Sequence, residues 1–399
     1  MVEYSPTTYP DSGVNYDLMD PFKIACQEAA LSTGKNIDRF RKENLSVKEI
    51  AESRGESAYQ VELSLVSGII SDGPFPIRIA HVEEGLGTKN EVAMQTRALQ
   101  EKLNLAEDIR DMLGRSFYRG VAIDNAAMIL NDLSTAGVSP ISFLLHVAAY
   151  PSSWFADEER NHDLIQGTLD ACNLARCSWG GGESPALRDI INEGHAVLSG
   201  SAWGIGFSWN RLNPMYLEEG DRIVLVGIDG PGANGITLLR TTIKDRLAKG
   251  YETLLSDGRT YGEAILAPTP IYARLVDALS DQKVRVNYAV NITGHAWRKI
   301  MRSSREFSYY IDKVPEAPEV FKLIQEVSGM SNEQIYGDYN MGAGFALFTR
   351  PDMAGQAVRI AKDLGYKAFD AGVVEKGPRR VVIGPPVNVT FSGEALQIR

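Results

Sequence analysis

The sequence contains few residues that form disulfides or metal sites. Its 399 residues include three cysteines, Cys26, Cys172 and Cys177, none of them in a CxxC pair, and five histidines. No two histidines have the spacing of metal ligands. A disulfide framework and a zinc site are therefore not expected, and a reducing, cytoplasmic location is predicted.

Long apolar runs and an excess of basic residues are also missing. No apolar run approaches the ~18 residues typical of a membrane-spanning helix, and residues 1–21 have neither the basic nor the apolar part of a signal peptide. The net charge of −10 and the pI near 5.2 argue against a general nucleic-acid-binding protein. We expect a protein that binds neither membranes nor nucleic acids. The negative net charge does not exclude a local basic pocket for a phosphorylated small molecule.

Common catalytic loops are absent from the chain. It has no Walker A loop, no GxSxG nucleophile elbow and no evident nucleophile–base set. Its 44% hydrophobic and 23% charged residues are typical of a globular protein. The length allows two ordinary domains.

Strand and helix patterns alternate in both halves, but not as strict βα pairs. This predicts an α+β fold with mixed α/β layers rather than a TIM barrel. The polar stretch 210–220, which contains Pro214, predicts a boundary between domains 1–215 and 216–399. Helices are predicted at 20–33, after a capping box at 46–49, and at 89–113, 121–135, 158–175, 267–272, 319–326 and 352–364. Strands are predicted at 61–70, 77–82, 141–149, 196–207, 222–228, 284–290, 343–348, 369–374 and 379–383.

The stretch Glu83–Lys89 is the first candidate for phosphate binding. The amides of Gly85 and Gly87 could approach a phosphate closely, Thr88 adds a hydroxyl, and Lys89 could neutralise a phosphoryl oxygen. A Gly-x-Gly pair alone is a weak signal, and the acidic residues could equally be solvated.

The second candidate is the predicted helix 121–135. Asp124 and Asn131 are seven positions apart, so they differ by only about 20° around the axis and share one flank, about 10 Å apart. Asp132 lies further round the helix. The alternative for Asp124 is a helix N-cap.

Oxygen ligands gather in these stretches and predict a magnesium site. Mg²⁺ prefers carboxylate oxygens and bridges substrate phosphates, and the candidates are Glu83, Glu84, Asp124, Asn131, Asp132 and Glu183. Glycine-rich turns at 180–183 and 230–235 could bind anions, although such turns are more often tight connections. His295 could serve as an acid, a base or a phosphate donor, although a lone histidine is more often structural. The residues alone predict a nucleotide-using enzyme without specifying its reaction.

Eight segments in order resemble the phosphoribosylformylglycinamidine cyclo-ligases, or AIR synthases, of purine biosynthesis. The wider superfamily also holds formylglycinamidine synthetases, selenophosphate synthetase, thiamine-monophosphate kinase and HypE. The matching segments are residues 11–14, 85–89, 123–132, 181–183, 230–235, 266–272, 292–294 and 340–344.

The resemblance implies an ATP- and Mg²⁺-dependent homodimer whose N-terminal sheets pair into a shared barrel, acting on a small phosphorylated substrate. ATP would phosphorylate an amide oxygen to an iminophosphate, and an internal amine would then close the imidazole ring. The resemblance implies three sets of site residues: Glu84, Asp124, Asp132 and Glu183 at the metal, Gly85, Gly87, Thr88, Lys89, Asn131, Gly181 and Gly182 at the nucleotide, and Lys89, Asp124, Thr293 and His295 in catalysis.

Several positions depart from the family pattern. Glu84 replaces the usual aspartate, Asn291 replaces a histidine, and His295-Ala296 fills a glycine pair. Residues 230–235 lack another histidine and a serine, and residues 40–60, which look helical, replace a glycine-rich segment. Two alternatives therefore stay open: an ATP-dependent relative that activates a different amide or small phosphorylated compound, and a non-catalytic nucleotide-binding relative.

Overall fold

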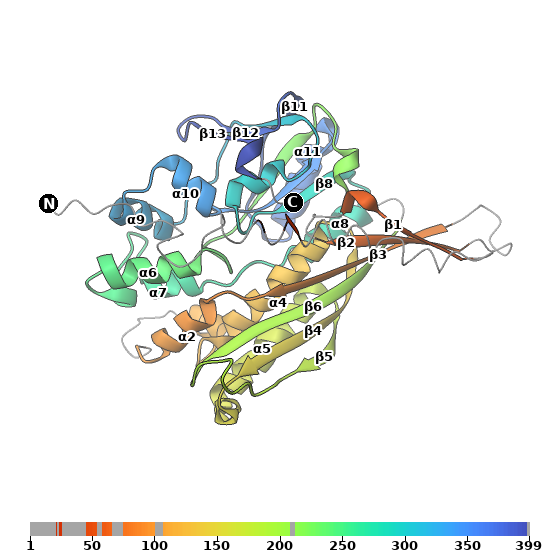
Figure 1. Ribbon diagram of the computed structural model, residues 1–399. Helices are drawn as coiled ribbons and strands as arrows, with labels where there is room; N and C mark the ends of the chain where they lie inside the picture. The colour runs from red at the N-terminus through yellow and green to blue at the C-terminus, as the bar shows by residue number, and fades with distance from the viewer. Residues whose placement is uncertain are drawn as a thin grey trace.

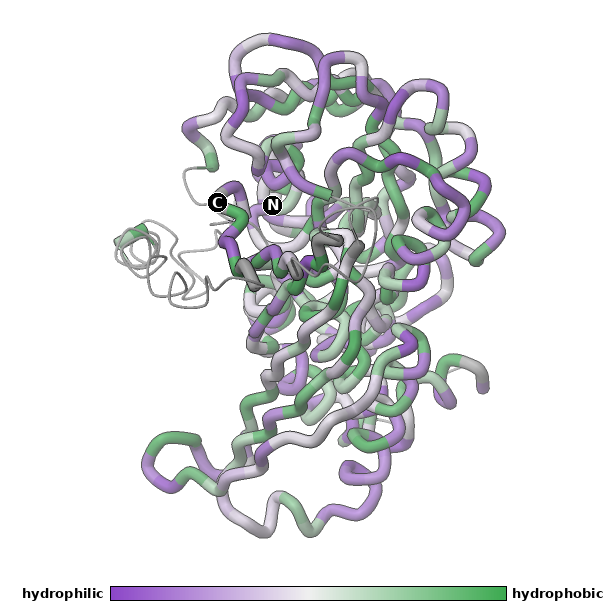
Figure 2. Tube along the Cα trace, turned by 90° about the vertical axis from the view of Figure 1, so that its right-hand side faces the viewer, coloured by the Kyte–Doolittle hydropathy of each residue, from purple (hydrophilic) through white to green (hydrophobic). Residues whose placement is uncertain are grey.

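The computed structural model describes residues 45–53, 58–65, 75–99, 107–207 and 212–396, and the single positions 21, 24 and 25. The motif 11–14 and most of the predicted helix 20–33 lie outside these residues. The described chain forms two sheets with helices packed on both, and it contains two parts joined along one long helix, α4 (Figure 1). A view turned by 90° again places one part above the other (Figure 2).

Sheet A belongs to the first half and has the strand order β1-β2-β3-β6-β4-β5. All neighbouring pairs are antiparallel except β4 and β5, which are parallel. The strands are β1 (Leu45–Glu49), β2 (Tyr59–Leu65), β3 (Phe75–Gly85), β4 (Ser139–Ala149), β5 (Ser178–Glu183) and β6 (Ala196–Phe207). Within the described ranges from residue 45 onward, the helices of this half are α2 (Lys89–Arg97), α3 (Glu107–Leu113), α4 (Tyr118–Ser134) and α5 (Glu158–Ala175), with short 3₁₀ turns η3 (Ala51–Ser53) and η4 (Ser152–Ala156).

Helices α4 and α5 cover one face of sheet A and lie behind its strands in Figure 1. The buried residues of this layer include Ile129 and Leu130 of α4, Phe143 of β4 and Ala202 of β6. The opposite face, here called the outer face, carries large apolar side chains that are 39–48% exposed: Tyr59, Leu144, Val197 and Trp203. Cross-strand pairing and the alternation along β6 place these four side chains on one side of the sheet.

Sheet B belongs to the second half and has the order β13-β12-β9-β11-β7-β10-β8. Its strands are β7 (Arg222–Gly227), β8 (Val286–Asn291), β9 (Phe307–Ile311), β10 (Ala343–Thr349), β11 (Ala368–Lys376), β12 (Arg380–Ile383) and β13 (Val389–Ser392). The helices are α6 (Ile236–Arg246), α7 (Tyr261–Leu266), α8 (Ala273–Asp281), α9 (Glu319–Ser328), α10 (Asn332–Asp338) and α11 (Pro351–Asp363). Four short 3₁₀ turns complete it: η5 (Pro214–Tyr216), η6 (Gly250–Glu252), η7 (Ala296–Met301) and η8 (Gly393–Ala395).

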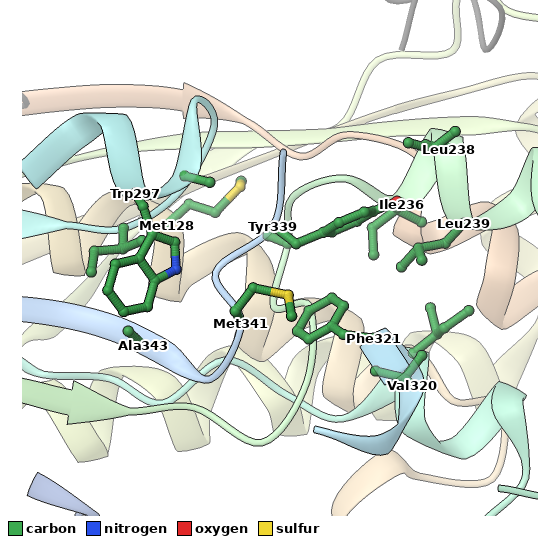
Figure 3. Packing of buried hydrophobic residues seen from close by; sticks show 14 of the residues in the cluster. Met128, Ile236, Leu238, Leu239, Trp297, Val320, Phe321, Tyr339, Met341 and Ala343 are labelled. Atoms are coloured by element: carbon green, nitrogen blue, oxygen red, sulfur yellow. The ribbon is translucent and has the colours of Figure 1, made fainter. Parts of the chain in front are cut away.

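The two halves share a large hydrophobic cluster. A single cluster of buried residues contains Val92 and Phe117 from the first half together with Ile236 and Tyr261 from the second. Figure 3 shows part of this cluster, in which Met128 of α4 lies among second-half residues that include Trp297. The halves are therefore packed against each other rather than tethered by a linker.

Three predicted elements differ from the structure. The capping box at 46–49 lies in strand β1, because pairing of β1 with β2 overrides a local helix signal, so the helical interpretation of residues 40–60 is wrong where the chain is described. Residues 267–272 connect α7 to α8 rather than forming a helix, since two prolines interrupt them. The segment 180–183 is part of edge strand β5 rather than a turn.

The predicted helix 89–113 is wrong as a single element. The described residues contain α2, which ends at Arg97, and a separate α3, which begins at Glu107. The helix predicted at 121–135 starts three residues earlier, at Tyr118, and its N-cap position is Phe117. Asp124 therefore lies inside α4, and its alternative interpretation as an N-cap is wrong.

Candidate functional site

Lys89 and Asp124 form an ion pair that is closed to solvent. Lys89 begins α2 directly after the glycine-containing stretch, and its Nζ lies 2.6 Å from Oδ2 of Asp124, with both side chains fully buried. The ammonium also donates to the carbonyl oxygens of Gly232 at 3.1 Å and Ala267 at 2.8 Å. An ammonium has three donors, so all of them are used. The predicted contact of Lys89 with phosphate stays a prediction.

Burial acts against the charge of both members of this pair. It lowers the pKa of Lys89 and raises the pKa of Asp124, while their mutual attraction opposes both shifts. The other carboxylate oxygen of Asp124 accepts hydrogen bonds from the backbone N–H of Thr269 at 2.9 Å and its hydroxyl at 2.5 Å. Asp124 is thus satisfied by protein groups from both halves.

Asn131 binds the same connecting segment as Asp124. Its Oδ1 accepts from the N–H of Tyr272 at 2.7 Å, and its Nδ2 donates to the carbonyl of Pro270 at 2.8 Å. The two side chains therefore share one flank of α4, as their seven-residue spacing predicted. Together they hold the connection between α7 and α8 along one side of α4.

Asp132 and Glu84 form a second acidic group beside α4. Glu84 follows the buried residues Ala80 and Val82 on the face of β3 that packs against α4. Burial and the nearby Asp132 raise the pKa of Glu84 to about 7, while Lys299 and Arg302 oppose the shift. Oδ1 of Asp132 accepts from Nδ2 of Asn291 at 2.6 Å.

Thr293 and His295 follow β8 and approach this group from the second half. The hydroxyl of Thr293 accepts a hydrogen bond from Nζ of Lys299 in η7. His295 and Ala296 both have left-handed backbones, with φ of 66° and 46°. This conformation is uncommon for residues other than glycine, so the chain keeps the backbone of a glycine-rich turn while carrying side chains there.

A small cavity lies between α4 and the second half. Its volume is about 10 Å³, room for about one water molecule. The residues that line it include Met128, Asn131, Gly232, Thr269, Asn291 and Thr293. Motif residues from both halves therefore meet around this small cavity.

The glycine-containing stretch 85–88 lies beside the glycine-rich turn of the second half. A Cβ at Gly87 would lie 3.9 Å from the carbonyl oxygen of Ala233, and the hydroxyls of Thr88 and Thr237 are 3.1 Å apart. Thr237 lies in the first turn of α6, whose N-terminal amides are suited to anions. Gly87 and Thr88 are thus placed near this helix end, whereas Gly85, at the end of β3, lies against Ser199.

Gly181, Gly182 and Glu183 are not brought to the other predicted residues within one chain. They lie on β5, which is separated from β3 by β4 and β6, about 14 Å at the usual strand spacing. Glu183 is exposed and accepts from the N–H of Ser184. A Cβ at Gly182 would come within 1.9 Å of the Leu145 carbonyl, so strand pairing explains that glycine.

The donor set fits Mg²⁺ at the pair Glu84 and Asp132. Glu84 and Asp132 repel each other electrostatically, and Mg²⁺ commonly uses one or two such carboxylates plus substrate phosphates. Asp124 already forms an ion pair with Lys89. Glu183 lies on β5, far from Glu84 and Asp132. Among the described residues, no group of three or more acidic, histidine or cysteine side chains could hold a metal.

Three residues near the site were not predicted from the sequence. Thr269 lies in a matched segment, so its position was available as a signal, although its bond to Asp124 was not. Lys299 and Arg302 have no motif signal, because they reach Glu84 only through the path of η7.

The two-sheet fold and the polar groups along α4 define an α+β protein of the AIR synthase type. A protein-family model described as AIR synthase related protein, N-terminal domain, matches residues 81–205, and its C-terminal counterpart matches residues 218–384. The chain therefore belongs to the AIR synthase related proteins, as the ordered motifs predicted. The predicted boundary between 215 and 216 stays a prediction.

Curated relatives carry the name phosphoribosylformylglycinamidine cyclo-ligase. The Clostridium perfringens protein is 27% identical over 387 residues, which cover 94% of this chain and 99% of the relative. The Clostridium novyi protein is 30% identical over 327 residues, which cover 80% and 92%.

Solved structures of HypE share the fold. HypE in the HypE–HypF complex aligns with a TM-score of 0.55 at 13% identity, covering 84% of this chain and 92% of that chain. HypE in complex with ATP aligns with a TM-score of 0.51 at 14% identity, covering 68% and 78%. The predicted AIR synthase-like α+β fold is confirmed. Within the described part of the chain, every helix is too short or too polar to cross a bilayer.

Proposed function

We propose that the protein is an ATP-dependent cyclo-ligase that closes the imidazole ring of formylglycinamidine ribonucleotide to give aminoimidazole ribonucleotide. The observation that carries this proposal is the meeting of Glu84 and Asp132 from the first half with Asn291 and Thr293 from the second. The names of relatives that match nearly the full chain support the same reaction.

The proposed reaction needs no protein nucleophile. The amide oxygen of the substrate attacks the γ-phosphorus of ATP, and ADP leaves. The substrate's own amine nitrogen then attacks the activated carbon, the C–O bond breaks, and phosphate leaves as the ring closes. Catalysis in this scheme comes from positioning and charge neutralisation.

The chain's polar residues suit these tasks. Thr293 and Asn291 line the cavity, and we assign them to the amide being activated, with His295 as the adjacent acid or base. Glu84 and Asp132 would hold Mg²⁺, which would neutralise phosphate charge when bound. Lys89 and Asp124 hold α2 and α4 against the second half.

We also propose that two copies pair through the outer face of sheet A in the cytoplasm. Trp203, Leu144, Val197 and Tyr59 expose apolar surface on that face, and contiguous exposed apolar surface is typical of interfaces. Pairing of these faces would give the closed barrel that the family resemblance implies.

An ATP-dependent enzyme for a different amide is the second candidate. The observation in its favour is the left-handed pair His295-Ala296, which adds side chains where the resemblance implies glycines. The change lies beside Thr293, on the substrate side of the site.

Incubating the pure protein with formylglycinamidine ribonucleotide, ATP and Mg²⁺ tests the proposal, with aminoimidazole ribonucleotide as the measured product. Folded protein that gives no product eliminates the cyclo-ligase. ATP turnover with other amides would then favour the second candidate. Calorimetric titration with Mg·ATP identifies a non-catalytic relative, which binds without turnover.

A further inference from the structure

Two cysteines meet where α5 ends. Arg176 has a left-handed backbone with φ of 57°, its N–H donates to the carbonyl of Asn173 at 3.2 Å, and the N–H of Cys177 donates to the carbonyl of Cys172 at 3.0 Å. These two bonds define a Schellman motif. The motif brings together the side chains at the positions of Cys172 and Cys177, which are usually a pair of hydrophobic residues.

In this chain the contact is between two thiols. Both cysteines are free, and Cys172 is 2% exposed while Cys177 is half-buried. Cys172 packs in the layer between α5 and α4, and Cys177 lies against the edge of the same cluster. The thiols are therefore held together by the end of a long helix and do not depend on a loop closing.

The two thiols are chemically unequal. A hydrogen bond from the Cys172 thiol lowers the pKa of Cys177. The same bond, together with burial, raises the pKa of Cys172. The more accessible sulfur is thus the better nucleophile, and its neighbour is a protonated thiol. Redox-active cysteines commonly have this arrangement of an accessible thiolate beside a resolving thiol.

We propose that Cys172 and Cys177 form a reversible dithiol–disulfide modification site that reacts with peroxides. The thiolate of Cys177 attacks one peroxide oxygen, the O–O bond breaks, hydroxide leaves, and Cys177 becomes a sulfenic acid. The Cys172 sulfur then attacks the Cys177 sulfur, the S–O bond breaks, and the leaving hydroxide takes the Cys172 proton as water. The two sulfurs lose two electrons and the peroxide gains them. A small thiol reverses the reaction by exchange.

The bridge fits the backbone already present. A disulfide needs two Cα atoms within about 7 Å, and a 3.0 Å backbone hydrogen bond joins these two residues. The bridge would join the last turn of α5 to the residue that precedes β5. Oxidation should therefore raise the melting temperature of the protein.

The test uses the full chain, fully reduced and then treated with equimolar hydrogen peroxide. We expect the intact mass to fall by two hydrogen atoms, a bridged peptide that contains Cys172 and Cys177 in a non-reducing digest, and full reversal by dithiothreitol. Cys26→Ser is the matched control, because it removes the remaining cysteine and should behave as wild type.

Variants assign the two roles. Cys177→Ser should react at least about tenfold more slowly, because the thiolate is the nucleophile, whereas Cys172→Ser should stop at a sulfenic acid on Cys177 that dimedone traps. Circular dichroism confirms that Cys177→Ser is folded. Cys177→Ala, which also lacks the thiolate, should react as slowly. A wild-type protein that forms no bridge, a bridge to Cys26, or a Cys177→Ser variant that reacts as fast as wild type would overturn the proposal.

Discussion

Nζ of Lys89 and Oδ2 of Asp124 are 2.6 Å apart in a place that water does not reach. Each partner is also hydrogen-bonded to the second half, Lys89 to Ala267 and Asp124 to Thr269. The pair therefore connects the two halves as well as α2 and α4.

Removing one member of this pair should destabilise the protein strongly. Lys89→Met leaves a buried carboxylate without a counter-charge, and such changes cost about 3–5 kcal/mol. Urea unfolding followed by circular dichroism measures the loss. Lys89→Met combined with Asp124→Leu should be less damaging than the sum of the two single changes. Additive losses would show that the two groups do not interact.

Asn131→Ala should also lower the free energy of unfolding, by about 2 kcal/mol or more, because the N–H of Tyr272 and the carbonyl of Pro270 lose their partner. Asn173→Ala is the matched control, since Asn173 is an exposed asparagine near the end of α5. If both variants lose the same free energy of unfolding, Asn131 does not hold residues 270–272.

The stability of the protein should depend on pH through Glu84. Its pKa rises from 4.5 to about 7 on folding, so between these values the folded protein keeps a proton that the unfolded chain has lost. The free energy of unfolding therefore falls as pH rises through this window. Glu84→Gln should remove this fall. At the upper end of the pH window the free energy of unfolding of the variant should exceed that of wild type by at most about 3 kcal/mol. Glu83→Gln, which changes the exposed neighbour on the other face of β3, should keep most of this fall in urea titrations, because Glu83 contributes only weakly to the raised pKa of Glu84.

Mg²⁺ should stabilise the protein through Glu84 and Asp132. The ion binds the charged carboxylate, so the rise in melting temperature on adding MgCl₂ should be larger above the Glu84 pKa than below it. Asp132→Asn should abolish this rise. Glu183→Gln should leave it intact, because β5 is remote from β3 within one chain. A rise that is lost only in Glu183→Gln would place the metal elsewhere.

Trp203→Glu should prevent pairing through the outer face of sheet A. Trp203 is 39% exposed there, and a charge buried in an apolar interface is strongly unfavourable. Light scattering after size-exclusion chromatography should report a dimer for wild type and a monomer for the variant. Leu169→Glu places the same charge at a 43% exposed leucine on α5 and should stay dimeric. A monomeric wild type contradicts the proposed barrel.

Elements with strong periodic patterns were predicted well from the sequence. Helix 158–175 and strand 196–207 have the predicted bounds, because their apolar spacing is long and is ended by clear polar residues. The shared flank of Asp124 and Asn131 followed from helix geometry alone. In these cases local physics and the final packing agree.

The errors lie where distant residues decide the structure. Residues 46–49 contain a good local helix start, but strand β2 supplies backbone partners that the sequence pattern does not reveal. The glycines of β5 look like a turn, and at Gly182 the reason for glycine is the close approach of the Leu145 backbone. Lys299 acts on Glu84 from η7, a turn that carries no sequence motif.

The shared core has a consequence for how this chain can be divided. Buried residues of both halves belong to one cluster, and the side chains of Lys89, Asp124 and Asn131 find their partners across the join. Either half made alone would expose that apolar surface to water and leave these polar groups without their hydrogen-bond partners. We therefore expect the two fragments to be insoluble when expressed singly and to fold on co-expression, so that each half acts as the folding template of the other.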